Sequence, residues 1–240
     1  MKCRIICHMI SSIDGRLYPS RWSTPFIKTD IGTVYDEAAS LYPFDGWIIG
    51  RPTMAELDDS IEERDTQLRI SEEERPPFIG NHTGKRLGIV FDSKGKLHYK
   101  SNILPSGEHI VTVLSVQVSD EYLQELQKVG VSYVFMGKGE DAVNVAIKNL
   151  EDAFKVKTLL LEGGGSINGS FLKANLIDEF SILIYPGVDG LAGVPSIINY
   201  VGKDKDELPS KDAQLHLLNC EKFAGDVVLL RYAVSYKNRE

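Results

Sequence analysis

A run of glycines after an apolar stretch is the clearest candidate for a site. Leu159–Leu161 leads into Glu162-Gly163-Gly164-Gly165, and a helical pattern follows over residues 166–175. Glycine lets a ligand approach the backbone closely, and the free N–H groups at a helix N-terminus favour an anion. The segment therefore predicts a site for an anion such as a pyrophosphate. A tight turn without a ligand is the alternative, because the spacing matches neither the dinucleotide-binding glycine fingerprint nor a phosphate-binding ATPase loop.

A second junction of the same kind occurs at Trp47-Ile-Ile-Gly50-Arg51-Pro52-Thr53. Proline suits the first helical position, so a helix is expected to begin directly after Gly50. Arg51 then stands beside the positive end of that helix, where its guanidinium could bind a cofactor phosphate through charged hydrogen bonds. Pairing with surface acids is the alternative for Arg51.

The turn after the first strand carries a third candidate. Ser12-Ile-Asp14-Gly15-Arg16 follows an apolar run, and Asp-Gly is a common turn pair. Open α/β sheets bind ligands at the carboxyl ends of their strands. If this strand is central, Asp14 faces a substrate; otherwise Asp14 is a turn residue.

The periodicity of apolar residues predicts the elements that position these segments. Short apolar strands alternate with helical patterns, which indicates a mainly parallel, doubly wound α/β sheet. After Ile177 the helical patterns stop, and the turn at Lys222–Asp226 predicts a C-terminal antiparallel hairpin. The predicted strands are 3–10, 46–50, 86–92, 109–114, 132–136, 157–162, 178–186, 214–222 and 227–236, and the predicted helices are 30–42, 52–58, 119–129, 140–154 and 166–175.

One domain is expected over residues 1–240, because no repeat or linker divides the chain. The stretch 58–75 holds eight acidic residues against three arginines and few apolar anchors. It predicts a solvated surface excursion that is partly helical at best.

Charge and composition exclude several classes of protein. The net charge is −7, which offers no basic field for nucleic acid or anionic lipid. No apolar run approaches the roughly 20 residues of a membrane helix. The N-terminus lacks the pattern of a signal peptide, so a cytoplasmic protein is expected. Three cysteines, Cys3, Cys7 and Cys220, fall in strand-like segments at no zinc spacing and predict buried structural thiols.

Taken in order, the motifs resemble a known family. They are Ser12-Ile-Asp-Gly-Arg16, Gly50-Arg-Pro-Thr53, Glu162-Gly-Gly-Gly165, and Leu176-Ile-Asp-Glu179 followed by Tyr185-Pro-Gly187. This set is similar to the pyrimidine reductases of riboflavin biosynthesis, which include the C-terminal domain of a bifunctional deaminase–reductase and share the dihydrofolate reductase-like fold. The likeness spans about residues 3–236.

The resemblance implies an NADPH-dependent oxidoreductase that reduces a ribosylamino-pyrimidine 5′-phosphate at C1′ to the ribitylamino form. It assigns the cofactor's phosphates to two groups of residues, which are Gly163, Gly164, Gly165, Ser166 and Ile167, and Gly50, Arg51 and Thr53. Ser93 and Lys94, after a predicted strand, are the candidates for the 2′-phosphate, since a lysine there would favour NADPH over NADH.

For the chemistry itself, the resemblance points to Asp14 and Glu162 as the groups that orient the substrate and help the imine nitrogen take up a proton. Glu162 capping the glycine loop is the alternative. Ser12 and His8 are implied as substrate contacts, and His8 stands where bifunctional members often carry a lysine. A homodimer through the C-terminal strands is also expected, because a terminal hairpin leaves an edge to cover.

Two departures from the family pattern bear on the substrate. The chain has no zinc-deaminase signature, so neither deamination nor a metal is expected. The acidic stretch 58–75 replaces the segment that contributes to the substrate's phosphate pocket, leaving Arg21, Arg64 or Arg69 as possible substitutes. The competing hypotheses are a dihydrofolate reductase-like NADPH reductase for another imine or carbonyl, and a regulatory nucleotide-sensing domain.

Overall fold

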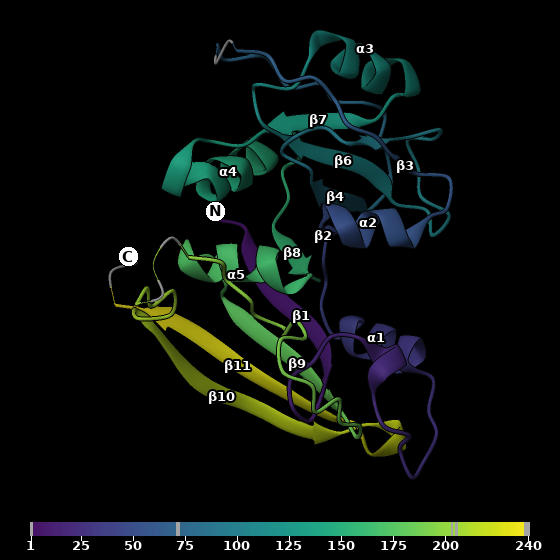
Figure 1. The fold of residues 1–240 in the computed structure, drawn as a ribbon, viewed down its shortest axis with the longest axis vertical. Helices are drawn as coiled ribbons and strands as arrows, with labels where there is room; N and C mark the ends of the chain where they lie inside the picture. Colours follow the sequence, from purple (N-terminus) through teal and green to yellow (C-terminus); the bar gives the residue numbers. More distant parts are fainter. Residues whose placement is uncertain (1, 71–72, 203, 205, 238–240) are drawn as a thin grey trace. The chain divides into compact units, whose positions relative to one another are not determined.

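The computed structural model describes residues 2–70, 73–202, 204 and 206–237 (Figure 1). The chain forms two compact units that interleave along the sequence. The central unit comprises residues 1–3 and 44–159, and the terminal unit comprises residues 4–43 and 160–240. Each unit is described separately below, and the single domain expected from the sequence stays a prediction.

The central unit is built on four parallel strands. In order across the sheet they are β2 (Gly46–Gly50), β4 (Leu87–Phe91), β6 (His109–Leu114) and β7 (Ser132–Phe135). The unit also contains α2 (Arg51–Leu57), α3 (Asp120–Val129), the short 3-10 helix η2 (Gly139–Asp141) and α4 (Ala142–Phe154). Residues such as Ile49, Ile110 and Leu126 form its buried apolar core. Parallel strands alternating with helices are the arrangement predicted from the sequence.

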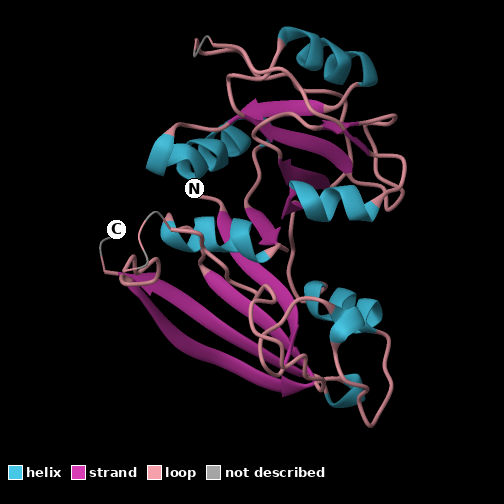
Figure 2. Ribbon diagram, viewed as in Figure 1, coloured by secondary structure: helices cyan, strands magenta, loops and turns pink. Residues whose placement is uncertain are grey.

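The terminal unit ends in the antiparallel hairpin that the sequence predicts (Figures 1 and 2). β9 (Glu179–Tyr185) pairs in parallel with β1 (Arg4–Ser12) and antiparallel with β11 (Val228–Tyr236), and β10 (Ala213–Lys222) pairs only with β11. The remaining elements of this unit are η1 (Pro19–Arg21), α1 (Ile31–Ala39), α5 (Gly165–Lys173) and η3 (Ala224–Asp226). The residues of β8 (Thr158–Leu161) are divided between the two units. The mainly parallel α/β class with a C-terminal antiparallel hairpin is thereby confirmed.

Two acids of the Leu176–Glu179 motif hold this unit together. The Asp178 carboxylate accepts the Ile5 N–H at 2.7 Å, which joins β9 to β1. Glu179 is buried, and its carboxylate accepts from the Tyr42 hydroxyl at 2.6 Å and from the Arg231 guanidinium at 2.8 Å. A buried carboxylate must be compensated in this way, so the motif has a structural role in joining β1, β9 and β11.

The described residues of the acidic stretch 58–75 are mostly exposed or partly exposed. Its described part contains no helix, and β3 (Glu62–Glu63) pairs antiparallel with β5 (Leu97–His98). Ile61 is buried and anchors the stretch to the core of the central unit. One buried apolar side chain and a short strand thus attach the stretch to the central unit, and its solvated character stays a prediction. Residues 71 and 72 lie outside the described residues.

Two smaller expectations also changed. α2 begins at Arg51, which puts Pro52 at the second helical position. Cys3 and Cys7 are buried as expected, but Cys220 is exposed, because β10 shows most of its residues to solvent. Within the described part of the chain, no helix combines the length and apolar character needed to cross a membrane.

Candidate functional site

The glycine loop of the terminal unit is a strand-to-helix junction. Gly163 has φ +98°, in the left-handed region that favours glycine, and the peptide bond between Gly163 and Gly164 is cis. Gly164 is the N-cap of α5 and has no side chain to accept from the helix. Among the described residues, the N-cap therefore supplies no side-chain acceptor to the first N–H groups of α5, and such groups favour an anion.

Packing within the chain explains the third glycine. A Cβ on Gly165 would lie 2.2 Å from the Ser196 carbonyl oxygen. The Asn199 N–H donates to the Gly165 carbonyl at 2.9 Å, and the Asn168 amide donates to the Ile197 carbonyl at 2.8 Å. Residues 196–199 thus lie directly against the start of α5. Gly165 is needed for that contact whether or not a ligand binds.

Asp14 is bound to the protein on several sides. Its carboxylate accepts the Ser12 hydroxyl at 2.7 Å, the Asp189 N–H at 3.1 Å and the Gly190 N–H at 2.9 Å. The Ser12 hydroxyl first, and then these two N–H groups, hold the pKa of Asp14 well below its usual range. Asp14 is therefore ionised and fastens the loop at Asp189 to the turn, which gives it a structural role.

A segment that sequence reasoning missed, residues 187–200, contacts both of these features. The Ile13 N–H donates to the Gly187 carbonyl at 2.9 Å, and the Arg16 guanidinium donates to the Val194 carbonyl at 2.6 Å. The same segment supplies the residues that pack on Gly165. It thereby brings the Asp14 turn and the glycine loop into one constellation. Its sequence signal was weak, consisting of Gly190 and Gly193, which the structure places at positive φ.

His8 is buried in the terminal unit. Its ring is fully buried, with Nδ1 3.0 Å from the Ser181 hydroxyl and Nε2 3.2 Å from the Tyr35 carbonyl oxygen. A carbonyl only accepts, so Nε2 carries the hydrogen and Nδ1 accepts from Ser181. Burial lowers the pKa of His8 to about 4. The neutral ring ties β1 to α1 and β9, and its expected contact with a substrate stays a prediction that this burial does not favour.

Glu162 acts electrostatically on Tyr35, which contacts His8. The Tyr35 hydroxyl donates to the His8 carbonyl oxygen at 2.8 Å. Burial, and after it the charge of Glu162, raise the pKa of Tyr35 well above its usual value. Glu162 is only partly exposed, and it lies between the end of β8 and the glycine loop. Its place in the chain puts Glu162 at the start of the glycine loop.

The junction of the central unit is held by an ion pair. Gly50 is the N-cap of α2, and Arg51 pairs with Glu63 of the acidic stretch. Thr53 follows in the first turn of α2 and is partly buried. This resting arrangement is the surface pairing that was the alternative interpretation of Arg51. A phosphate would have to replace Glu63 as the partner of the guanidinium.

Ser93 and Lys94 lie exposed on a turn after β4. The buried Asp92 shapes this turn, because its carboxylate accepts the N–H groups of Lys96 at 2.6 Å and Leu97 at 2.8 Å. Asp92 was missed as a shaping residue, although Asp followed three residues later by Gly is a turn pattern. The turn leaves both predicted side chains free to meet a ligand from solvent.

A cavity of about 800 Å³ lies at the carboxyl ends of β6 and β7 in the central unit, within the size range of ligand pockets. Sequence reasoning did not find it. The Ser115 N–H donates to the Ser93 carbonyl at 3.0 Å, so the wall of the cavity adjoins the Ser93 turn. Its lining includes Arg75, Ser115, Gln117, Lys138, Asn149 and Asp152.

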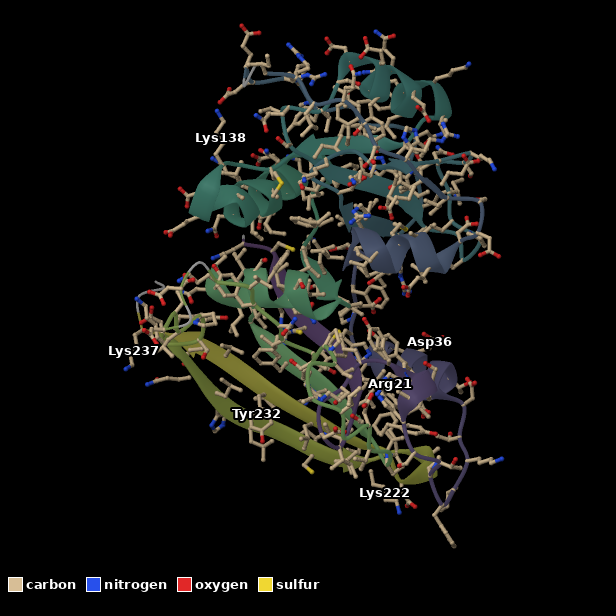
Figure 3. The ribbon with its side chains drawn as sticks, viewed as in Figure 1. Arg21, Asp36, Lys138, Lys222, Tyr232 and Lys237 are labelled. Atoms are coloured by element: carbon tan, nitrogen blue, oxygen red, sulfur yellow. The ribbon has the colours of Figure 1, made fainter. Side chains whose placement is uncertain are left out.

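The three arginines considered for a substrate phosphate each have a carboxylate partner. Arg21, labelled in Figure 3, pairs with Asp189 at 2.7 Å in the terminal unit. In the central unit, Arg64 pairs with Glu62 and Arg69 with Asp120. Among the residues that the structure describes, no group of three or more His, Cys, Asp or Glu side chains could hold a metal ion.

Comparison with known proteins assigns the family. The model of the RibD C-terminal domain matches residues 4–229, nearly the whole chain. The chain belongs to the RibD C-terminal domain family. It is 22% identical over 203 residues to the 2,5-diamino-6-ribosylamino-4(3H)-pyrimidinone 5′-phosphate reductase of Aquifex aeolicus, with 81% of each chain covered. The reductase of the same name from Archaeoglobus fulgidus is 29% identical over 112 residues, which cover 46% of this chain and 50% of that one.

Structural comparison supports the fold of this RibD C-terminal domain. A pyrimidine reductase-like protein from Corynebacterium diphtheriae matches with a TM-score of 0.65 at 18% identity, covering 98% of this chain and 92% of that one. At this identity the likeness shows the fold alone. The family suggested by the sequence motifs is confirmed by the match over residues 4–229.

Proposed function

We propose that this chain is an NADPH-dependent reductase that converts a ribosylamino-pyrimidine 5′-phosphate into its ribitylamino form. The observation that carries the proposal is the family match over residues 4–229, which includes Glu162 and the glycine loop. The names of the Aquifex and Archaeoglobus relatives support the same reaction.

Binding of a dinucleotide requires hydrogen-bond donors and positive charges for its phosphates. The capless start of α5 offers N–H groups from Gly165, Ser166 and Ile167 to a phosphate. Arg51 offers a guanidinium once it releases Glu63, and the exposed Lys94 offers a charge for the 2′-phosphate. Taken separately, each unit therefore offers groups that fit a phosphate of the cofactor, whose nicotinamide supplies a hydride when bound.

We assign the adenosine end of the cofactor to the cavity beside Ser93. The cavity's volume of about 800 Å³ and its mixed polar and apolar lining suit a purine and ribose. The hydrogen bond between Ser115 and Ser93 makes this assignment continuous with a 2′-phosphate on the Ser93 turn.

The chain's own groups would orient the substrate and move one proton. The open-chain form of the sugar carries an imine at C1′, whose nitrogen needs a proton when C1′ accepts a hydride. Glu162 is the proposed proton donor. Asp14, ionised and fixed by Ser12, Asp189 and Gly190, is proposed to orient the substrate through the loop that it fastens.

Among the three arginines, Arg21 is the best candidate for the substrate's phosphate. Its partner Asp189 donates its N–H to Asp14, so Arg21 belongs to the same unit and the same hydrogen-bonded group as Asp14. Arg64 and Arg69 lie in the central unit. Replacing Arg21 with alanine should raise KM for the phosphorylated substrate, and Arg69→Ala is the matched control.

A homodimer through the hairpin is also part of the proposal. β10 pairs on one side only and exposes Leu215, Leu217 and Leu218, each about half accessible. An edge strand with apolar side chains needs a cover, and a second copy supplies one. Light scattering at micromolar concentration should give twice the monomer mass, and a monomer would contradict this point.

The deciding experiment follows NADPH consumption by the purified protein. We expect turnover with the authentic pyrimidine 5′-phosphate and a much higher KM for its dephosphorylated form. Protein that binds NADPH but reduces neither compound would shift the assignment to the second hypothesis, a dihydrofolate reductase-like enzyme for another imine or carbonyl. The carboxylate partners already present on all three arginines are the observation that keeps this hypothesis open.

A further inference from the structure

Another cavity of the central unit lies at the amino ends of β2 and β4 and has a volume of about 290 Å³. Its lining includes Phe44 and Asp45 before β2, His82 and Gly84–Arg86 before β4, and Phe154 and Val156 before β8. Arg51 and Lys94, the candidates for cofactor phosphates, follow the carboxyl ends of β2 and β4. A strand of five residues spans roughly 15 Å, so this cavity is separate from both of them.

Arg86 differs from the other arginines of the protein in having no carboxylate partner. Each of the other arginines that the structure describes forms an ion pair with an aspartate or glutamate. The protein has a net charge of −7, so acids are plentiful, yet none of the described ones pairs with Arg86. Its guanidinium is therefore available to an anion from solvent.

The ring of Phe44 holds this guanidinium in place. The central carbon of the guanidinium lies 4.1 Å from the centroid of the Phe44 ring. A guanidinium stacked on a ring keeps its N–H edge free, and this planar fork matches two oxygens of a phosphate. Both residues line the cavity, so the fork is already oriented at its wall. Such preorganisation reduces the side-chain entropy that binding would cost.

Neighbouring lysines add positive charge to the same wall. Lys85 lines the cavity, and Lys155 and Lys157 flank the lining residue Val156 in the sequence. All three lysines are exposed, and none forms an ion pair with an acid in the part of the chain that the structure describes. Lysine supplies a point charge to a phosphate, which complements the fork of an arginine.

The negative groups of the wall are compensated by backbone donors. The Asp45 carboxylate accepts the N–H groups of Lys157 at 2.6 Å and Thr158 at 3.0 Å. α4 ends beside the cavity at Phe154, and the Lys155 N–H donates to the Glu151 carbonyl at 2.9 Å in its last turn. The charges of Lys85 and Arg86 therefore exceed that of Asp45 among the described lining residues.

His82 offers a further polar atom to a ligand. Its Nδ1 lies 3.1 Å from the Gly80 carbonyl oxygen, and a carbonyl only accepts, so Nδ1 carries the hydrogen. Nε2 of the neutral ring is then an acceptor for the O–H of a protonated phosphate, and it becomes a donor when the ring is protonated. The edge-to-face contact with Phe154, whose ring centroid lies 5.2 Å away, orients the His82 ring.

We infer that this cavity binds a phosphate group, as inorganic phosphate or as a small phosphate monoester, between the Arg86 fork and Lys85. The site goes beyond the proposed function, which assigns neither cofactor nor substrate to these residues. The volume of about 290 Å³ is at the lower end of the range for ligand pockets, so a phosphate with a small sugar fits and a dinucleotide does not.

The first test titrates the isotope-labelled full chain with inorganic phosphate at constant ionic strength and follows the amide chemical shifts. We expect saturable shifts at Asp45 and Gly84–Arg86. Arg86→Gln should weaken this binding about tenfold, since a charged hydrogen bond is lost. Lys128→Gln, which removes an exposed cation of α3 in the same unit, is the matched control and should bind as the wild type does. Shifts that do not saturate, or equal affinity in Arg86→Gln, would overturn the inference.

Two gentler variants test the orientation of the fork. Phe44→Leu removes the ring below the guanidinium and changes no charge, so phosphate should bind about threefold more weakly. Arg86→Lys keeps the charge and loses the fork, so its affinity should lie between those of wild type and Arg86→Gln. Wild-type affinity in both variants would overturn the inference. Unchanged amide shifts away from the cavity show that each variant is folded.

The source of the phosphate is decided by titrations with ribose 5-phosphate and ribose. Tighter binding of ribose 5-phosphate than of inorganic phosphate identifies a monoester, and equal affinity identifies free phosphate; either result supports the site. Ribose binding as tightly as ribose 5-phosphate would overturn it. Phosphate shifts confined to Arg51 and Gly163–Ile167 would also overturn the inference while leaving the proposed function intact. Saturable shifts at Gly84–Arg86 in a protein that does not bind NADPH would support the site and reject the proposed function.

Discussion

The two glycine-marked junctions share a local pattern but are held in different ways. At Gly50 a strand leads into α2, and the partner of Arg51 is Glu63, an exposed side chain of the acidic stretch. At Gly163 a strand leads into α5, and the partners are backbone atoms of Ser196 and Asn199. One junction is therefore held by a surface ion pair, and the other by close backbone packing.

This difference predicts different responses to mutation. A surface ion pair contributes little to stability and can exchange its partner for a ligand. Backbone packing tolerates no added atom, because protein interiors are close-packed. Substitutions at the Gly50 junction should therefore change cofactor affinity, and those at the Gly163 junction should change folding stability. The predictions below test that division.

The largest effect is expected from His8, a buried base of the terminal unit. The folded-state pKa of His8, about 4, lies below the ordinary 6.5. Between pH 6.5 and 4, His8 therefore takes up a proton in the unfolded chain but stays neutral in the folded protein. This contribution to the free energy of unfolding is fully present above pH 6.5 and is lost as the pH falls toward 4. The loss amounts to about 3 kcal/mol.

Urea unfolding at several pH values measures this loss. Burial also lowers the pKa of His109 in the central unit to about 4, so the wild type should show both contributions. The His8→Asn variant should have a shallower decline between pH 6.5 and 4 than the wild type, whatever its absolute stability. An unchanged slope would mean that His8 is protonated alike in both states.

Next in size is the effect of a methyl group on the glycine loop. Gly165→Ala would place Cβ 2.2 Å from the Ser196 carbonyl oxygen, and a backbone atom yields only at the cost of moving residues 196–199. We expect a loss of about 1–3 kcal/mol in the free energy of unfolding. Gly32→Ala is the matched control at another helix start, since its Cβ meets only the Asp30 carboxylate at 3.4 Å. Equal free energies of unfolding for the two variants would contradict the close packing that distinguishes the Gly163 junction.

A smaller effect is expected when the guanidinium of the Gly50 junction is removed. Arg51→Ala should weaken NADPH binding by about 1–2 kcal/mol through loss of a charged hydrogen bond, with the free energy of unfolding nearly unchanged. Titration calorimetry measures the affinity, and Arg64→Ala, which pairs with Glu62, serves as the control. Unchanged affinity in Arg51→Ala would remove Arg51 from the cofactor site.

The smallest effect is expected at Glu63, which competes with the cofactor's phosphate for Arg51. Glu63→Gln releases Arg51 from its partner, so NADPH should bind more tightly by less than about 1 kcal/mol, and the gain should shrink at high salt. Glu62→Gln is the control, because Glu62 pairs with Arg64 and Lys100 instead. Weaker binding in Glu63→Gln would show that the pair with Arg51 supports the site.

The sequence by itself determined the elements and the motifs. Each predicted strand and helix lies within three residues of its observed bounds, because apolar periodicity and turn residues are local properties. The same local signals located the Asp14 turn, the Gly50 junction and the glycine loop. The family followed from the order of these motifs, which the chain itself carries.

Only the tertiary structure decided what these residues contact. The partner of Arg51, the packing of residues 196–199 on Gly165, and the bond from the Tyr35 hydroxyl to the His8 carbonyl all join positions that are distant in sequence. Secondary-structure propensity does not predict such contacts, because it depends only on residues that are close in the sequence. Their positions follow from the burial of the two cores and the pairing of strands, which bring distant segments together only when the chain has folded.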